Sequence, residues 1–193
     1  MSDRHRLIVI GVSAGGLQTL SRFLPQLPAD FPTPIVIVQH VAEDAGEYLI
    51  CHLDKLCSIP VREAFDKQVI EEGTVTIAPS GYHLLVESRG TLALSMDERV
   101  RYSRPSIDVL FESAADAYGA ALTGIVLTGA NSDGAQGLRR IKECGGMAVV
   151  QDPDDALYPA MPQSAIESTK PDHIVKLDQL PALLTTIELG RHV

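Results

Sequence analysis

Leu7-Ile8-Val9-Ile10-Gly11-Val12-Ser13-Ala14-Gly15-Gly16 is the stretch that decides the fold of this 193-residue chain. Apolar, mostly β-branched residues run into a glycine-rich turn, and a helical pattern follows, which predicts a buried parallel strand leading into a helix. Ser13 stands where the strand ends. Glycines on both sides allow a tight turn and leave the hydroxyl of Ser13 uncrowded. The N–H groups that follow would begin the helix, where unpaired N–H groups can hold an anion.

The turn at Ser13 fits three interpretations. The first is a dinucleotide-binding turn, but the stretch departs from the fingerprint G-x-G-x-x-G because Ser13 replaces the middle glycine. The next predicted strand also ends in Gln39-His40, where that fingerprint expects an acidic residue. Ser13 could instead cap the following helix, or it could be a nucleophile on a strand-to-helix turn, similar in logic to the nucleophile elbow. Taken alone, the turn favours the capping serine, so the rest of the chain must decide.

Composition predicts one globular domain spanning residues 1–193, with 45% hydrophobic and 21% charged residues. The net charge of −9 argues against non-specific binding of nucleic acid and against adhesion to anionic lipid. No apolar run reaches the roughly 18 residues that a membrane span requires, and residues 1–6 lack a secretory signal. We therefore expect a cytoplasmic protein with no membrane insertion. Its three cysteines, with no C-x-x-C pair, are expected to be reduced thiols used as small core residues.

Strand and helix patterns alternate along the chain, which predicts an α/β fold: a doubly wound, mostly parallel sheet with helices on both faces. The expected strands are 7–10, 35–38, 61–64, 124–128, 147–150 and 174–175, and the expected helices are 17–24, 46–56, 104–118, 137–144, 161–166 and 180–189. The section between them changes character: 74–79 alternates, and 82–87 and 91–95 flank a reversal at Arg89-Gly90. This section predicts an inserted antiparallel β-hairpin, followed by a solvated charged loop at 97–101.

Ser13, His40 and Asp133 each follow the carboxyl end of a predicted parallel strand. Those ends share one edge of the sheet, where α/β proteins bind ligands, so we expect the three residues around one cleft. A histidine can take the proton of a serine hydroxyl, and a carboxylate can orient that histidine. The N–H groups of Ala14 and Ala130 could then stabilise an oxyanion. The implied reaction is hydrolysis of an ester or an amide.

Plainer interpretations exist for the same residues. His40 could be a polar loop residue, and Asp133 could be a turn or N-cap aspartate before Gly134. The other histidines show no metal-ligand spacing, and Asp152, Asp154 and Asp155 do not match a known cation loop, so we expect a solvated loop there and no metal site.

Taken together, the motifs resemble the catalytic domain of CheB-type chemoreceptor protein-glutamate methylesterases, over about residues 7–184. The resemblance rests on an ordered set: Gly11 to Gly16, Gln39-His40, Ile77-Ala78-Pro79 with His83, Arg104 to Asp108, Leu127-Thr128-Gly129, Asp133 to Gly137, and Met161-Pro162 with Ala165-Ile166.

The resemblance implies that Ser13 is the nucleophile, His40 the base and Asp133 the residue that orients it. It implies a doubly wound parallel sheet with an inserted hairpin, and hydrolysis of γ-glutamyl methyl esters on receptor helices with release of methanol. Some members also deamidate glutamine. The expected partner is a methylated receptor or a receptor-like helical protein, and no cofactor is expected.

The chain departs from the family pattern in three places. Ala14 stands where the family usually has Thr, Ala130-Asn131-Ser132 replaces a stretch that usually begins Met-Gly, and 41–47 replaces a Pro-rich stretch. We therefore expect the hydrolase chemistry to be retained more readily than the usual substrate. The alternative is a weakly active or inactive relative that binds and regulates a helical signalling partner.

Only six residues precede the first predicted strand. The sequence is therefore expected to be a stand-alone catalytic domain without the receiver domain that such enzymes often carry. Its cleft would then be open constitutively, or a separate regulator would act in trans.

Overall fold

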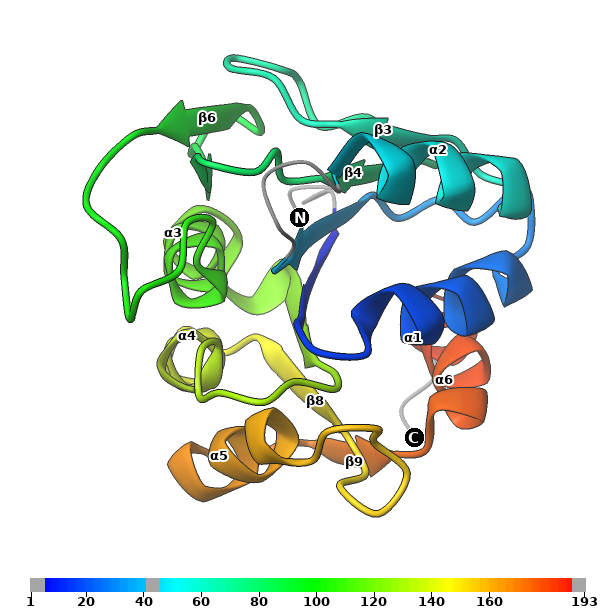
Figure 1. Cartoon of the computed structure of the whole chain (residues 1–193), viewed down its shortest axis with the longest axis vertical. Coiled ribbons are helices and arrows are strands. Elements are labelled where there is room, and N and C mark those ends of the chain that lie inside the picture. Colours follow the sequence, from blue (N-terminus) through cyan, green and yellow to red (C-terminus); the bar gives the residue numbers. More distant parts are fainter. Residues whose placement is uncertain (1–5, 41–45, 189–193) are drawn as a thin grey trace.

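The computed structural model describes residues 6–40 and 46–188. Sequence-based expectations for residues 1–5, for 41–45 and for Leu189 lie outside this range. The main sheet is parallel, with the strand order β3-β4-β2-β1-β7-β8-β9, and β1 (Leu7–Val12) is its central strand (Figure 1). The other members are β2 (Ile35–Gln39), β3 (Val61–Glu63), β4 (Val75–Ile77), β7 (Leu122–Val126), β8 (Met147–Gln151) and β9 (His173–Val175).

Helices cover both faces of this sheet, as predicted (Figure 1). One face carries α1 (Gly16–Phe23), α2 (Gly46–Leu56) and α6 (Leu180–Glu188); the other carries α3 (Ile107–Tyr118), α4 (Ala135–Glu143) and α5 (Ala160–Ser168). Short 3₁₀ turns lie at Leu24–Gln26 (η1), Gly119–Ala121 (η2) and Leu177–Gln179 (η3).

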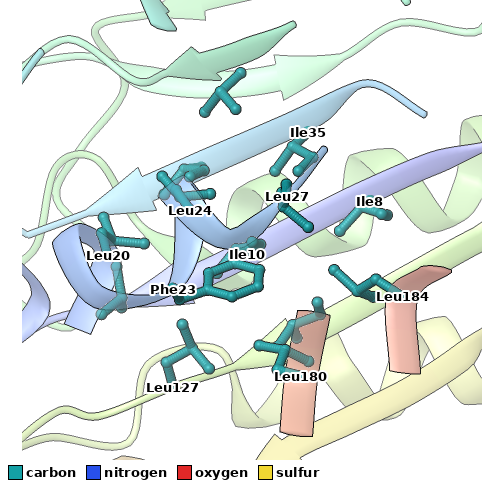
Figure 2. Packing of buried hydrophobic residues seen from close by; sticks show 14 of the residues in the cluster. Ile8, Ile10, Leu20, Phe23, Leu24, Leu27, Ile35, Leu127, Leu180 and Leu184 are labelled. Atoms are coloured by element: carbon teal, nitrogen blue, oxygen red, sulfur yellow. The ribbon is translucent and has the colours of Figure 1, made fainter. Parts of the chain in front are cut away.

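The central strand β1 is buried on both faces. Ile8, Ile10 and Val12 join the core beneath α1, α2 and α6, whereas Leu7 and Val9 join the core beneath α3, α4 and α5. Figure 2 shows the first core, with side chains from β1 packed against those from α1 and α6. A continuous apolar run is what a strand buried on both faces requires.

The inserted antiparallel hairpin is present, but it is shorter than the section that predicted it. β5 (His83–Val86) pairs with β6 (Leu92–Ser95), and the pair packs on α3. The segment 74–79, grouped with this insertion by its sequence pattern, instead contributes β4 to the main sheet, between β2 and β3. The charged stretch after β6 is largely exposed, as expected.

Two expectations about core residues are wrong. In the first predicted helix, Leu17, Leu20, Phe23 and Leu24 have the spacing of one apolar face, which predicts a buried Leu17, but Leu17 is 38% exposed. The cysteines are free, as expected, but Cys51 is exposed on α2 and is not a core residue, whereas Cys57 and Cys144 are half-buried and pack against the two cores. Within residues 6–40 and 46–188, no helix combines the length and the apolar character needed to cross a bilayer.

The order of the strands places a crevice above β1. The chain leaves β1 towards β2 on one side, and it leaves β7 towards β8 on the other. Neighbouring strands whose connections diverge in this way form the switch point at which α/β sheets bind ligands. Ser13 follows β1, and the loop that contains Asp133 follows β7.

Candidate active site

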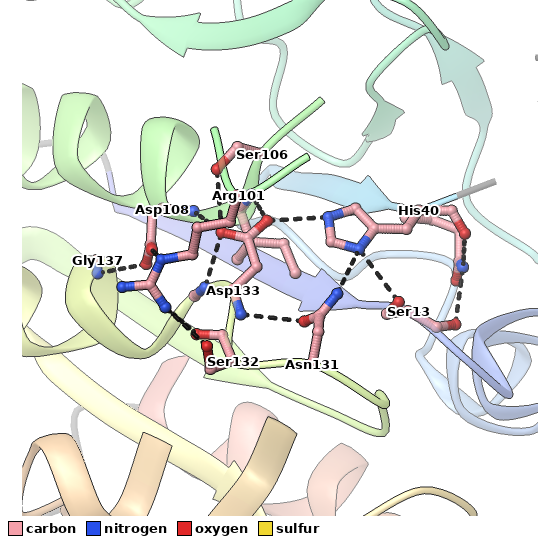
Figure 3. Close-up of polar contacts among 12 residues, drawn as sticks. Ser13, His40, Arg101, Ser106, Asp108, Asn131, Ser132, Asp133 and Gly137 are labelled. Atoms are coloured by element: carbon pink, nitrogen blue, oxygen red, sulfur yellow. Dashed lines mark hydrogen bonds and ion pairs between the residues drawn. The ribbon is translucent and has the colours of Figure 1, made fainter. Parts of the chain in front are cut away.

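Ser13, His40 and Asp133 form one chain of side-chain contacts at the carboxyl edge of the sheet (Figure 3). Nδ1 of His40 lies 3.1 Å from Oγ of Ser13, and Nε2 of His40 lies 2.9 Å from Oδ2 of Asp133. Backbone hydrogen bonds of the sheet continue past the strand ends and hold these residues: Ser13 N–H donates to Thr128 O, and His40 N–H donates to Val12 O. The hydroxyl of Ser13 therefore faces an imidazole and does not cap a helix.

The orientation of the imidazole determines which tautomer the site requires. An ionised carboxylate only accepts hydrogen bonds, so the proton of neutral His40 belongs on Nε2, facing Asp133. Nδ1 is then free to accept the proton of Ser13. In the serine protease triad the two ring nitrogens have the opposite roles. The exchange leaves the chemistry unchanged, because each nitrogen still faces the partner that its role requires.

Asp133 is anchored by the N-terminus of α3. Its carboxylate is 1% exposed and accepts five hydrogen bonds, from the N–H groups of Ile107, Asp108 and Gly134, the hydroxyl of Ser106 and Nε2 of His40. Burial alone would raise the pKa of Asp133. The hydrogen bonds from His40 and from the backbone of α3 outweigh burial and lower its pKa. Asp133 therefore stays ionised, as a residue that orients an imidazolium must.

Gln39 ties the backbone of Ser13 to that of His40. Its Nε2 donates to Ser13 O at 2.9 Å and to His40 O at 2.8 Å, and the side chain is buried. Oε1 of Gln39 has no hydrogen-bond partner among the described residues and lies against Gly16. By sequence, Gln39 is a strand end and part of the Gln39-His40 motif, but its side chain was given no role, so this positioning contact was missed.

The two predicted oxyanion donors lie at the ends of adjacent strands. Ala14 follows Ser13 after β1, and Ala130 follows the end of β7. Within residues 6–40 and 46–188, neither backbone N–H donates to a protein acceptor. Gly15, with φ 77°, adopts the left-handed conformation that lets the chain turn into α1 directly after Ala14.

A groove of about 590 Å³ opens beside Ser13 and His40. It runs along α1 and α2, and its walls are Ser13, Ala14, Gly15, Gly16, Leu17, Gln18, Ser21, Gln39, His40, Tyr48 and His52. The rings of Tyr48 and His52 stack, with their centroids 5.7 Å apart. Leu17 is exposed because it lines this groove, which places an apolar surface next to the serine.

The structure adds polar residues that the sequence did not assign to the site (Figure 3). Asn131 Nδ2 lies 3.3 Å from Nδ1 of His40. Arg101, on the exposed stretch after β6, donates to the hydroxyl of Ser132 at 2.7 Å and lies 3.9 Å from Asp108. The departure from the family pattern at 130–132 was the only sequence signal for Asn131.

In the described part of the chain, no three His, Cys, Asp or Glu side chains form a group that could hold a metal ion. Asp155, from the acidic loop after β8, accepts hydrogen bonds from Gln151 and from the N–H of Leu177. These contacts give that carboxylate a structural role in joining the loop to η3.

Comparisons with known proteins show the family and the fold of this chain. The sequence model of the family described as CheB methylesterase matches residues 8–184. A Pseudomonas aeruginosa protein named protein-glutamate methylesterase/protein-glutamine glutaminase 1 is 38% identical over 98% of this chain, which spans about half (49%) of that protein. A Leptospira interrogans protein, named for the same two activities with a provisional qualifier, is 51% identical over 95% of both chains. The crystal structure of the Thermotoga maritima CheB methylesterase catalytic domain superposes with a TM-score of 0.90, covers 95% of this chain and 98% of its own, and is 33% identical.

Proposed function

Because this chain belongs to the CheB methylesterase family, we propose that it is a serine esterase that hydrolyses γ-glutamyl methyl esters on a chemoreceptor-like helical protein. The observation that carries the proposal is the continuous contact from Ser13 Oγ through the imidazole of His40 to the buried carboxylate of Asp133. Such a chain of contacts activates a serine for attack on an acyl carbon.

In the acylation step, Ser13 Oγ attacks the ester carbonyl carbon, and its proton passes to Nδ1 of His40. The π electrons of the carbonyl move onto its oxygen, which the N–H groups of Ala14 and Ala130 stabilise. Asp133 stabilises the imidazolium through Nε2–H. The oxyanion electrons then re-form the carbonyl as the bond to the methoxy oxygen breaks, and that oxygen takes the proton from Nδ1 and leaves as methanol.

Water completes the reaction on the acyl-enzyme. Nδ1 of His40 takes a proton from the water, whose oxygen attacks the acyl carbon. The resulting oxyanion re-forms the carbonyl as the bond to Ser13 Oγ breaks, and Ser13 Oγ regains the proton from Nδ1. The product is a free glutamate side chain. A glutamine side chain can follow the same sequence with ammonia as the leaving group, which agrees with the second activity in the names of the relatives.

The test measures methanol release from a receptor fragment methylated with a labelled methyl group. Ser13→Ala is expected to lower the rate by at least about 10³-fold, because it removes the hydroxyl that forms the acyl-enzyme. Ser168→Ala, at the end of α5 and away from the groove, is the matched control and should keep the wild-type rate. A fluorophosphonate probe should label wild type at Ser13 and leave Ser13→Ala unlabelled.

Two results would contradict the proposal. Methanol release by Ser13→Ala at the wild-type rate would show that Ser13 is not the nucleophile. An unlabelled wild-type Ser13 together with no methanol release would favour the alternative, a protein that only binds and regulates its helical partner.

A further inference from the structure

Two side-chain donors face the same atom of the proposed base. Among the described residues, Nδ1 of His40 is approached by Ser13 Oγ at 3.1 Å and by Asn131 Nδ2 at 3.3 Å (Figure 3). Asn131 lies in the loop between β7 and α4, two residues before Asp133. Its side chain thus reaches from the loop of the carboxylate to the side of the imidazole that faces Ser13.

The orientation of the Asn131 amide follows from its other contact. Oδ1 of Asn131 accepts the backbone N–H of Asp133 at 3.0 Å. Only the oxygen of an amide can accept such a bond, so the amide nitrogen must be the atom directed at His40. The Oδ1 contact keeps Asn131 beside His40, and it does not depend on the protonation state of His40.

Proton transfer removes the acceptor from Asn131. Neutral His40 carries its proton on Nε2, so Nδ1 has one lone pair for two donors. When the proton of Ser13 moves to Nδ1, that nitrogen becomes a donor and no longer accepts a bond from Asn131. At the same moment, negative charge forms on the oxygen of the carbon now bonded to Ser13 Oγ.

We propose that Asn131 is a further catalytic residue, whose Nδ2 turns from His40 to donate a hydrogen bond to this oxyanion. The inference rests on the proposed Ser13 and His40 chemistry. Asn131 would join the backbone N–H groups of Ala14 and Ala130 as a side-chain donor to the oxyanion. Asn131 and Ala130 lie on the same loop. A nearby donor that bonds the oxyanion only once its charge develops lowers the barrier and not the substrate dissociation constant.

The test compares Asn131→Ala and Asn131→Asp with wild type. Asn131→Ala removes the donor, and we expect kcat for methanol release to fall about 10- to 100-fold with KM within about twofold of wild type. Asn131→Asp keeps an oxygen for the N–H of Asp133 but places negative charge by the oxyanion, so its kcat should fall further. Labelling of Ser13 by a fluorophosphonate should slow by a similar factor in each variant, because a phosphoryl oxygen occupies the oxyanion position.

The matched control is Ser132→Ala, which removes a hydrogen bond of the same loop to Arg101 without touching His40. It should keep kcat within about twofold. All rates are expressed per Ser13 that a saturating dose of probe can label. A purely structural role of Asn131 would lower the number of labelled sites and leave kcat per site unchanged, and that result overturns the inference.

A kcat of Asn131→Ala equal to or above wild type would also overturn it. If the wild-type protein releases no methanol from the receptor fragment, the proposed substrate is wrong, yet the labelling rates still decide the role of Asn131. Failure of the substrate proposal and failure of this inference are therefore distinguishable.

Discussion

Asp108 places a second buried carboxyl group next to the carboxylate of Asp133. Asp108 is 5% exposed, and it accepts the N–H of Gly137 at 2.8 Å. Burial raises the pKa of Asp108 to about 6, and the negative charge of Asp133 contributes, while the N–H of Gly137 opposes the rise. Asp133 accepts five hydrogen bonds and has a lowered pKa. Asp133 accepts more hydrogen bonds than Asp108. As pH falls, Asp108 therefore takes up a proton first, while Asp133 stays ionised.

The raised pKa of Asp108 predicts a pH-dependent stability. Its pKa of about 6 in the folded protein exceeds the ordinary value of 3.8, so folding favours the protonated form. The contribution of Asp108 to the free energy of unfolding therefore falls as pH rises from about 4 to 6, and stays lower above pH 6. Asp108→Asn keeps an acceptor for Gly137 without the charge, and it should be more stable than wild type by roughly 1–2 kcal/mol at pH 8. The gain should shrink towards pH 4.

Urea unfolding at pH 4.5 and pH 8 measures this difference. The control is Asp116→Asn, which removes an exposed carboxylate paired with Arg140 and should change stability by less than about 0.5 kcal/mol. An equal gain for Asp108→Asn at both pH values would mean that packing, and not ionisation, is responsible.

At the scale of elements, local pattern predicted strands and helices better than it predicted their partners. The helix at 46–56 has the predicted ends, because apolar spacing is a property of the helix itself. Segment 74–79 has the alternation of a strand, but alternation does not say which strand it pairs with, and β4 joined the main sheet.

In the site, too, the sequence pattern predicted where residues lie better than it predicted which side chains they contact. The rule for strand ends predicted that Ser13, His40 and Asp133 would share one edge, because the edge is fixed by the direction of parallel strands. The contacts of Arg101 and Asn131 cross between loops, and no periodicity encodes them. Leu17 fits an apolar stripe but lines the groove, because α1 begins at the site itself.

The start of α1 gives a prediction at this scale. A Cβ on Gly16 would lie 1.6 Å from Oε1 of Gln39, whose Nε2 holds the backbone of Ser13 and His40. Gly16→Ala should therefore displace the Gln39 amide, lower kcat about 10- to 100-fold and cost roughly 1–3 kcal/mol of stability. In the double variant Gly16→Ala with Gln39→Ala, the clash is gone, so its kcat should match that of Gln39→Ala alone.

The control is Gly46→Ala, also at the first residue of a helix. Among the described residues, the nearest atom to its Cβ would be Ser80 Oγ at 3.9 Å, so Gly46→Ala should keep the wild-type kcat. If the effects of Gly16→Ala and Gln39→Ala simply add in the double variant, the clash with Gln39 is not the cause.

At the scale of the whole molecule, the protein carries a large negative net charge, whereas the described lining of the groove beside Ser13 is uncharged. The chain has 25 acidic and 16 basic residues and a net charge of −9. The described lining of the groove beside Ser13 includes no Asp, Glu, Lys or Arg. The groove therefore suits the uncharged ester better than the carboxylate product, while the molecule as a whole repels an acidic partner.

This contrast predicts how salt acts on the reaction. Each ester that is hydrolysed leaves a carboxylate, so the proposed receptor segment is acidic and is repelled by a protein of charge −9. Screening lengths shorten from about 30 Å at 0.01 M salt to about 10 Å at 0.1 M. The value of kcat/KM for methanol release from the receptor fragment should therefore rise severalfold between 0.01 M and 0.2 M NaCl, with kcat unchanged. A small uncharged methyl ester is the control, and its kcat/KM should not change. A kcat/KM on the receptor fragment that falls with salt would mean that a local basic side chain, such as the exposed Arg101, attracts the substrate in spite of the net charge.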